Sequence, residues 1–328
     1  MKHSLAGIIA SVLILSSAAR ASNGDGGYAA PFFQIPMGAR PTGLGGAYLG
    51  VSDDGAGPLF NPAGLADLSR PVLGTAYRSL SLDRVMGYVT VTFPARGQAA
   101  VGLNWLYAGS GEVMARDQNG VELGHTLGMA SHAFSALFAK KFEDYLSAGL
   151  KASYLQASFA EMTAFSVSFD FGVMLYLNSF FGRETQYTMP VQDMRLGLTV
   201  MHVAAEYRWH NENYLHEFRD ANALGTQQND AVPAEVGVGG SARFINKKLL
   251  AAADLRKNDK QDIVFHGGAE YLLVKQLSLR SGYSDKRFAA GAGFTFAFGK
   301  RILAIDYAFS SGKVAEGSDH IFSLDLQF

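Results

Sequence analysis

Most of the chain consists of short stretches in which apolar side chains alternate with small or polar ones. In one stretch Phe165, Phe169 and Phe171 occupy alternate positions, with serine, aspartate and glycine between them. Phe294 and Phe296 stand in a second stretch of the same kind. Successive side chains of a β-strand point to opposite faces of the sheet. The pattern therefore predicts strands that have one apolar face and one small or polar face.

About fourteen strands are expected, each roughly ten residues long. They cover residues 71–79, 86–94, 98–108, 132–142, 145–157, 163–177, 194–203, 233–245, 248–257, 262–273, 275–284, 287–299, 301–310 and 319–328. The connections between them alternate between short turns and longer segments, of which the longest are 109–131 and 204–232. An even strand number and this asymmetry are typical of bacterial outer-membrane barrels, whose periplasmic turns are short.

A soluble β-sandwich would also alternate, so the residues on the less apolar face decide between the two classes. These are mainly Gly, Ser, Thr and Ala, with occasional charges such as Lys151 and Arg243. Charged residues make up 17% of the chain, against about 25% in soluble domains. The sequence thus predicts an all-β transmembrane fold, a single antiparallel outer-membrane β-barrel over residues 71–328.

Two connections have a character of their own. Residues 178–193 form a long connection on the side where short turns are expected. Within residues 205–232, Tyr207, Tyr214 and Phe218 recur at helical spacing. A short amphipathic helix over the barrel mouth and an ordinary loop with interfacial aromatic residues both fit this second segment.

The last predicted strand ends on an aromatic carboxy terminus. Its apolar face carries Phe322, Leu324, Leu326 and Phe328. Such a strand resembles the signal by which the outer-membrane barrel assembly machinery recognises its substrates. We therefore expect these four residues to direct assembly rather than to act in function.

The amino terminus predicts export. Lys2 and His3 precede an apolar stretch over residues 5–15, and Ala19-Arg20-Ala21 reads as a cleavage site. The stretch is shorter than the ~20 residues that a spanning helix needs. We expect residues 1–21 to be a signal peptide and the mature chain to lie in the outer membrane of a Gram-negative-type cell.

Charge and cysteine content exclude several classes of function. Cleavage would remove Lys2 and Arg20, so that Lys and Arg fall from 28 to 26 against 29 acidic residues and the net charge changes from −1 to −3. That balance gives no support to a nucleic-acid partner. The chain has no cysteine, which excludes disulfides, thiolate metal sites and cysteine nucleophiles.

Residues 22–70 are rich in Gly and Pro but lack the composition of a disordered tail. Their densest features are Gly45-Gly46, Asp53-Asp54 and Asn61-Pro62-Ala63-Gly64. Glycine permits close backbone approach, and Asn-Pro sets a tight turn. Asp53 and Asp54 suit either hydrogen bonding to turn amides or coordination of a cation. A compact hatch that plugs the lumen of the barrel is expected here.

Residues 38–65 resemble the amino-terminal hatch of the FadL-type outer-membrane transporters, and most closely the PorV/PorQ branch. The likeness lies in Gly38-Ala39-Arg40, in the Gly43–Ala47 run, in Asp53-Asp54 and in Asn61-Pro62-Ala63-Gly64-Leu65. It implies a monomeric 14-stranded barrel with a hatch. It also implies one of two functions: passage of hydrophobic compounds, or, as in PorV relatives, reception of exported proteins in type IX secretion.

Enzyme and cofactor motifs are scarce. No Gly-x-Ser-x-Gly occurs, and the run 237–242 matches a dinucleotide fingerprint only by letter because it lies within an alternating strand. His202, His210 and His216 cluster, but without the spacing that places two on one helical face. We therefore expect no enzymatic activity, no cofactor and no metal.

Two functions follow from these patterns, and a structural barrel with no transport role stays open beside them. The first is hatch-gated passage or binding of a hydrophobic small molecule, for which the apolar segment 32–37 could line a lumen pocket or pack against the wall. The alternative is a type IX secretion-type component that binds exported cargo proteins. Both place the chain in a lipid bilayer after delivery by the assembly machinery, as a monomer.

Overall fold

The computed structural model describes residues 28–328 apart from 118, 160–161, 182–189, 211–227 and 313–316. The predicted signal peptide, residues 1–21, lies outside the described residues. No helix in the described part of the chain is long and apolar enough to cross a membrane.

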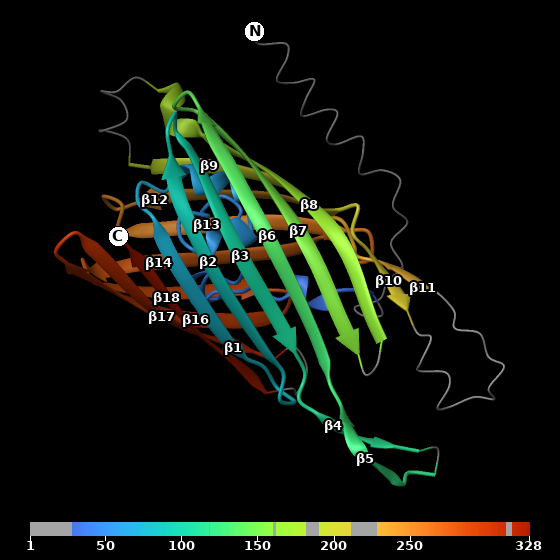
Figure 1. Ribbon diagram of the computed structural model, residues 1–328. Coiled ribbons are helices and arrows are strands. Elements are labelled where there is room, and N and C mark those ends of the chain that lie inside the picture. Colours follow the sequence, from blue (N-terminus) through green and yellow to red (C-terminus); the bar gives the residue numbers. More distant parts are fainter. Residues whose placement is uncertain (1–27, 118, 160–161, 182–189, 211–227, 313–316) are drawn as a thin grey trace.

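The described strands form one large antiparallel sheet that closes on itself (Figure 1). Most strands pair with their neighbours in the chain, but β3 pairs with β6, β8 with both β9 and β10, and β9 with β12. The pairing of β1 with the last strand β18 closes the ring. The strands of the ring are β1 (Val72–Ser79), β2 (Val85–Ala95), β3 (Ala99–Gly109), β6 (Met129–Phe142), β7 (Leu146–Phe159), β8 (Met162–Tyr176), β9 (Gln192–Val203), β10 (Glu206–His210), β11 (Gln228–Ala231), β12 (Glu235–Phe244), β13 (Leu249–Asn258), β14 (Val264–Val274), β15 (Leu277–Ser284), β16 (Arg287–Phe298), β17 (Arg301–Ser311) and β18 (Ser318–Gln327).

The ring holds fourteen strands among the described residues once two interrupted strands are each counted as one. β10 continues β9 along β8, and β11 continues toward β12. The first interruption lies where His202 and Ala204 have left-handed backbones, with φ of 60° and 61°. The predicted fourteen-stranded antiparallel barrel is confirmed.

The outer face of the barrel is apolar and the inner face is small or polar, as the alternation predicts. Phe165 and Phe171 are exposed on the outside of β8, whereas Ser168 and Asp170 between them are buried. Leu103 on β3 is 65% exposed. A continuous apolar belt of this kind is stable in hydrocarbon and unfavourable in water. The molecule is therefore a transmembrane β-barrel.

The carboxy-terminal strand completes the ring. β18 pairs with β1 over the whole length of β1 and with β17 on its other edge. Phe322, Leu324 and Phe328 are exposed on its outer face. Their placement fits the predicted assembly signal, which stays a prediction because recognition by the machinery is a property of the unfolded chain.

Two connections depart from the expected picture. The segment 109–131 contains a hairpin of β4 (Val113–Arg116) and β5 (Glu122–Leu127), which projects beyond the barrel in Figure 1. The helix considered for residues 205–232 is wrong where the chain is described, because Tyr207 lies in β10, hydrogen-bonded between β8 and β11. Tyr214 and Phe218 lie outside the described residues. The long connection 178–193 begins with a 3-10 helix, η5 (Leu177–Phe180).

Residues 28–70 lie inside the barrel and are called the N-terminal segment below (Figure 1). The segment carries only short helices: η2 (Pro31–Gln34), α2 (Ala39–Gly43), η3 (Gly57–Leu59) and η4 (Pro62–Asp67). Wall glycines let it approach closely. A Cβ added at Gly172 would lie 2.1 Å from Oδ1 of Asn61, and one added at Gly268 would lie 2.4 Å from the carbonyl oxygen of Leu44.

Candidate functional site

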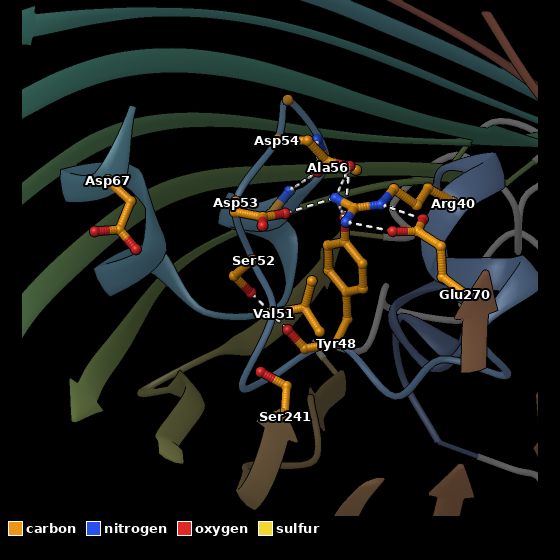
Figure 2. Close-up of polar contacts among 12 residues, drawn as sticks. Arg40, Tyr48, Val51, Ser52, Asp53, Asp54, Ala56, Asp67, Ser241 and Glu270 are labelled. Carbon is orange, nitrogen blue, oxygen red and sulfur yellow. Dashed lines mark hydrogen bonds and ion pairs between the residues drawn. The ribbon is translucent and has the colours of Figure 1, made fainter. Parts of the chain in front are cut away.

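An arginine at the centre of the N-terminal segment joins it to the wall. Arg40, on α2, donates through Nη1 to Asp53 (2.5 Å) and Asp54 (3.3 Å), and through Nε and Nη2 to Glu270 of β14 (2.8 and 3.1 Å). The hydroxyl of Tyr48 donates to Asp54 at 2.5 Å. Figure 2 shows these side chains converging on the guanidinium group. A partly buried bidentate arginine–carboxylate pair of this kind fixes orientation as well as charge.

The two adjacent aspartates have opposite electrostatic properties. Burial opposes ionisation of Asp53, but the guanidinium groups of Arg40, Arg195 and Arg243 outweigh it and hold the pKa of Asp53 below its ordinary value. Burial raises the pKa of Asp54, the charge on Arg40 opposes the rise, and the charge on Asp53 adds to it. Asp54 also accepts the main-chain N–H groups of Ala56 and Gly57, each at 3.0 Å. Of the two roles open from the sequence, Asp54 has the turn-amide role.

Side chains of the barrel wall hydrogen-bond to the main chain in the middle of the N-terminal segment. Oδ2 of Asp254, on β13, accepts the N–H groups of Tyr48 (2.7 Å) and Leu49 (2.9 Å). Ser241 on β12 donates to the carbonyl of Gly50 at 2.7 Å. Wall side chains thereby replace the hydrogen bonds that this irregular backbone cannot make to itself.

Asn61 links two parts of the segment to the barrel. Its side chain is fully buried; Nδ2 donates to the carbonyls of Leu49 (3.0 Å) and Val173 (3.1 Å), and Oδ1 accepts the N–H of Ala63 (3.0 Å). Pro62 is the first residue of η4, where its fixed φ suits the helix start. Asn61 thus pairs with main-chain groups of both the segment and the wall.

The predicted glycines stand where a side chain would collide. Gly45 and Gly46 have φ of +66° and +84°, and a Cβ on Gly45 would lie 2.5 Å from the main-chain nitrogen of Tyr283 on β15. A Cβ on Gly64 would lie 2.1 Å from the carbonyl oxygen of Ser52. Glycine is therefore required for the segment to turn and pack at these points.

A cavity of about 480 Å³ lies between the segment and the barrel end that carries β4 and β5. Phe32, Phe33, Ile35 and Met37 line it on the side of the segment, whereas the wall residues that line it are mostly polar or charged, with Leu106, Met201 and Val264 as apolar members. Phe32 and Met37 are also buried against Leu106 and its neighbours on the wall. The apolar segment 32–37 therefore does both things considered from the sequence: it packs against the wall and it lines a lumen pocket.

Charged groups hold this apolar stretch in place. Arg78 of β1, 1% exposed, donates to the carbonyl of Pro36 (2.5 Å) and to Asp319 of β18 (2.6 Å). His202 stacks on Phe33 with ring centroids 4.2 Å apart. Lys151 pairs with Asp170 beside it. These contacts position the aromatic side chains at the cavity.

Metal-ligating side chains do not gather at this site in the described part of the chain. His202 lies in the wall against Phe33, whereas His216 lies outside the described residues.

The structure brings the predicted hatch residues into one body and adds partners that sequence reasoning missed. Arg40 stands within the quoted Gly-Ala-Arg motif, yet its carboxylate partner Glu270 is 230 residues away. Asp254 and Arg78 were missed as well. For Arg78 a signal was present, because it is the one charge on a strand face that otherwise carries Val72, Gly74 and Ala76, whereas Asp254 shares its face with Arg256.

Solved structures share this architecture at low sequence identity. A Pseudomonas aeruginosa FadL homologue matches with a TM-score of 0.58 and 11% identity, covering 90% of this chain and 98% of that one. The Pseudomonas putida toluene transporter TodX matches with 0.58 and 11%, covering 88% and 96%. CymD, a monoaromatic hydrocarbon channel, matches with 0.59 and 12%, covering 90% and 98%. Neither a protein-family model nor a curated protein matches the chain. The likeness shows a common fold.

Proposed function

We propose that this chain is an outer-membrane channel for a hydrophobic small molecule, with residues 22–70 acting as a hatch that gates the lumen. One observation supports the proposal: residues 28–70 lie inside the barrel, and their apolar stretch 32–37 lines the cavity at one end of it. A lumen blocked in this way passes a solute only when the hatch changes its contacts.

The apolar stretch covers a wall surface from which a hydrophobic solute can displace it. Phe32 and Met37 cover Met86, Tyr88 and Leu106 on the inner wall. Burial of apolar surface contributes roughly 25 cal/mol per Å², whichever apolar group covers it. A solute that takes the place of a Phe side chain therefore recovers most of the free energy that the displacement costs.

The contacts of the hatch are strong at its centre and few at this stretch. Arg40, Asp254 and Asn61 hold residues 40–63 to the wall through charged or fully buried hydrogen bonds. The polar contacts of residues 32–37 to the wall go through Arg78, which donates to Pro36, while Phe33 stacks on His202 and the remaining contacts are apolar packing or the Thr42 hydrogen bond within the hatch. We infer that the stretch 32–37 moves first when a solute enters.

The descriptions of the similar solved structures support this class of function. Two of them are described as a toluene transporter and a monoaromatic hydrocarbon channel. The same likeness, together with the apolar outer belt, supports an outer-membrane location. We further propose that the chain acts as a monomer and that Phe322, Leu324, Leu326 and Phe328 direct its insertion by the assembly machinery.

Uptake of radiolabelled toluene into cells that express the chain tests the proposal. Wild-type protein should raise uptake above the empty vector, and Phe33→Ala should change it, because the variant opens space at the cavity. Phe265→Ala, on the lipid-facing side of β14, is the matched control and should behave as wild type. Uptake equal to the empty vector with toluene and with longer hydrocarbons alike would rule out the channel.

The secretion alternative is favoured by one observation. Hairpin β4–β5 projects beyond the barrel and exposes Val113, Met114, Val121 and Leu123. A projecting apolar hairpin suits contact with another protein. Deleting residues 111–127 should abolish capture of an exported protein if the alternative holds, and should leave solute uptake unchanged if the channel proposal holds.

A further inference from the structure

Basic side chains gather at one end of the barrel. This end carries the amino end of β1, the carboxy end of β18 and the turns after β2, β6, β12, β14 and β16. The exposed basic residues of these turns form what we call the basic rim: Arg70, Arg96, Lys140, Lys247, Lys248, Lys275, Lys300 and Arg301. Among the described residues, the exposed acidic side chains at the same end are Glu143 and Asp144.

The opposite end has no such excess. Its exposed basic residues in the described part of the chain are Arg116, Arg208, Lys260 and Lys286, and its exposed acidic residues are Asp83, Glu112, Glu122 and Asp262. The eight basic residues of the rim and the two acidic residues Glu143 and Asp144 beside them give a net side-chain charge of +6, whereas the exposed charges at the other end sum to zero. The asymmetry follows the two ends of the barrel and is hidden in the overall net charge of −1.

The rim lies at the level of exposed aromatic residues. Phe142, Tyr145, Phe298 and Phe328 are all exposed at this end. The ammonium group of Lys140 lies 5.5 Å from the ring centroid of Phe142. Aromatic side chains with lysine and arginine beyond them mark the boundary between hydrocarbon and headgroups.

The turns are too short to carry these charges away from the membrane. β16 ends at Phe298 and β17 begins at Arg301, and β14 and β15 are separated by the two residues 275–276. The basic groups therefore lie in the headgroup layer itself, which favours a lipid over a soluble protein as their partner.

We propose that the basic rim binds the phosphate groups of anionic phospholipids and enriches them around this end of the barrel. The inference rests on barrel geometry and charge, and does not depend on the proposed solute channel. Each basic group near an anionic lipid surface adds a favourable increment that salt screens. Binding should therefore scale with the net charge of the rim.

Lipid selectivity of the full chain reconstituted in phosphatidylcholine vesicles tests the proposal. Electron spin resonance with spin-labelled phosphatidylglycerol and spin-labelled phosphatidylcholine gives the ratio of the two association constants. Wild-type protein should prefer phosphatidylglycerol, and the preference should weaken in high salt.

A rim variant and a matched control separate local from general electrostatics. The variant Lys140→Gln, Lys248→Gln, Lys275→Gln, Lys300→Gln lowers the net charge of the rim from +6 to +2, so the logarithm of the preference should fall to about one third. The control Arg116→Gln, Arg208→Gln, Lys260→Gln, Lys286→Gln removes four charges from the other end and should keep the wild-type preference. Heat-modifiable migration checks that both are folded.

Three outcomes would overturn the proposal. They are equal association of the two lipids with wild-type protein, an unchanged preference in the folded rim variant, and an equal loss in the control. The first of these would point to another anionic partner for the rim, such as an acidic protein.

Discussion

Replacing Asn61 by alanine should loosen the hatch without unfolding the barrel. The substitution removes three hydrogen bonds from a fully buried side chain: those to Leu49, to Val173 and from Ala63. At about 1 kcal/mol for each bond, the loss is about 3 kcal/mol. That corresponds to roughly a hundredfold shift of the local opening equilibrium. The wall is spared because its strands bond to one another around the ring.

Hydrogen exchange followed by mass spectrometry measures this shift directly. Amides of η4, residues 63–67, should exchange about a hundredfold faster in Asn61→Ala than in wild type. Amides of β16 and β17 serve as an internal reference and should not change. Asn119→Ala, at an exposed site in the β4–β5 hairpin, is the control. Unchanged exchange in residues 63–67 would refute the view that Asn61 fixes the hatch to the wall.

Two further predictions concern acid pH and assembly. Leak of small solutes through reconstituted protein should rise below about pH 4, because the pKa of Asp53 is held below its ordinary value and the stability that its ionised form contributes is lost as the pH falls through that depressed pKa. The raised pKa of Asp54 contributes to the stability of the hatch with the opposite sign. Asp53→Asn should leak already at pH 7 and respond less to acid. A leak that is independent of pH in wild type would contradict the reasoning. Deleting Phe328 should reduce the amount of heat-modifiable protein in the outer membrane, since β18 must be recognised and paired with β1 to remove the open edges; normal amounts after the deletion would contradict the assembly role.

The sequence was sufficient to predict the barrel because alternation is a local property. A phenylalanine at every second position, as at Phe165 and Phe171, decides which face of a strand meets lipid without knowledge of its neighbours. The number of strands and most strand boundaries could be predicted from the same alternation. The hairpin β4–β5 was missed because its apolar residues, such as Val113 and Leu123, stand in a region whose length alone marked it as a connection.

The hatch could be predicted only in part, for the same physical reason. Tight turns are predicted at Gly45, Asn61 and Pro62 from the residue types alone. The partners of the hatch do not, because Arg40 meets Glu270 and Tyr48 meets Asp254 only after the barrel has closed. Pairings between residues more than 200 positions apart carry no local signal, so the charged centre of the site had to be read from the structure.

Locking the hatch to the wall tests the central claim most directly, and the absence of cysteine from the chain makes the experiment clean. The main-chain nitrogen of Ala39 lies 2.7 Å from Oγ of Ser323 on β18, so the two residues are in contact and cysteines at these positions are candidates for a disulfide. In the Ala39→Cys, Ser323→Cys protein, oxidation should abolish uptake of toluene and reduction should restore it, while each single variant should give the same uptake in both redox states. Equal uptake by the oxidised and reduced protein would contradict gating by the hatch.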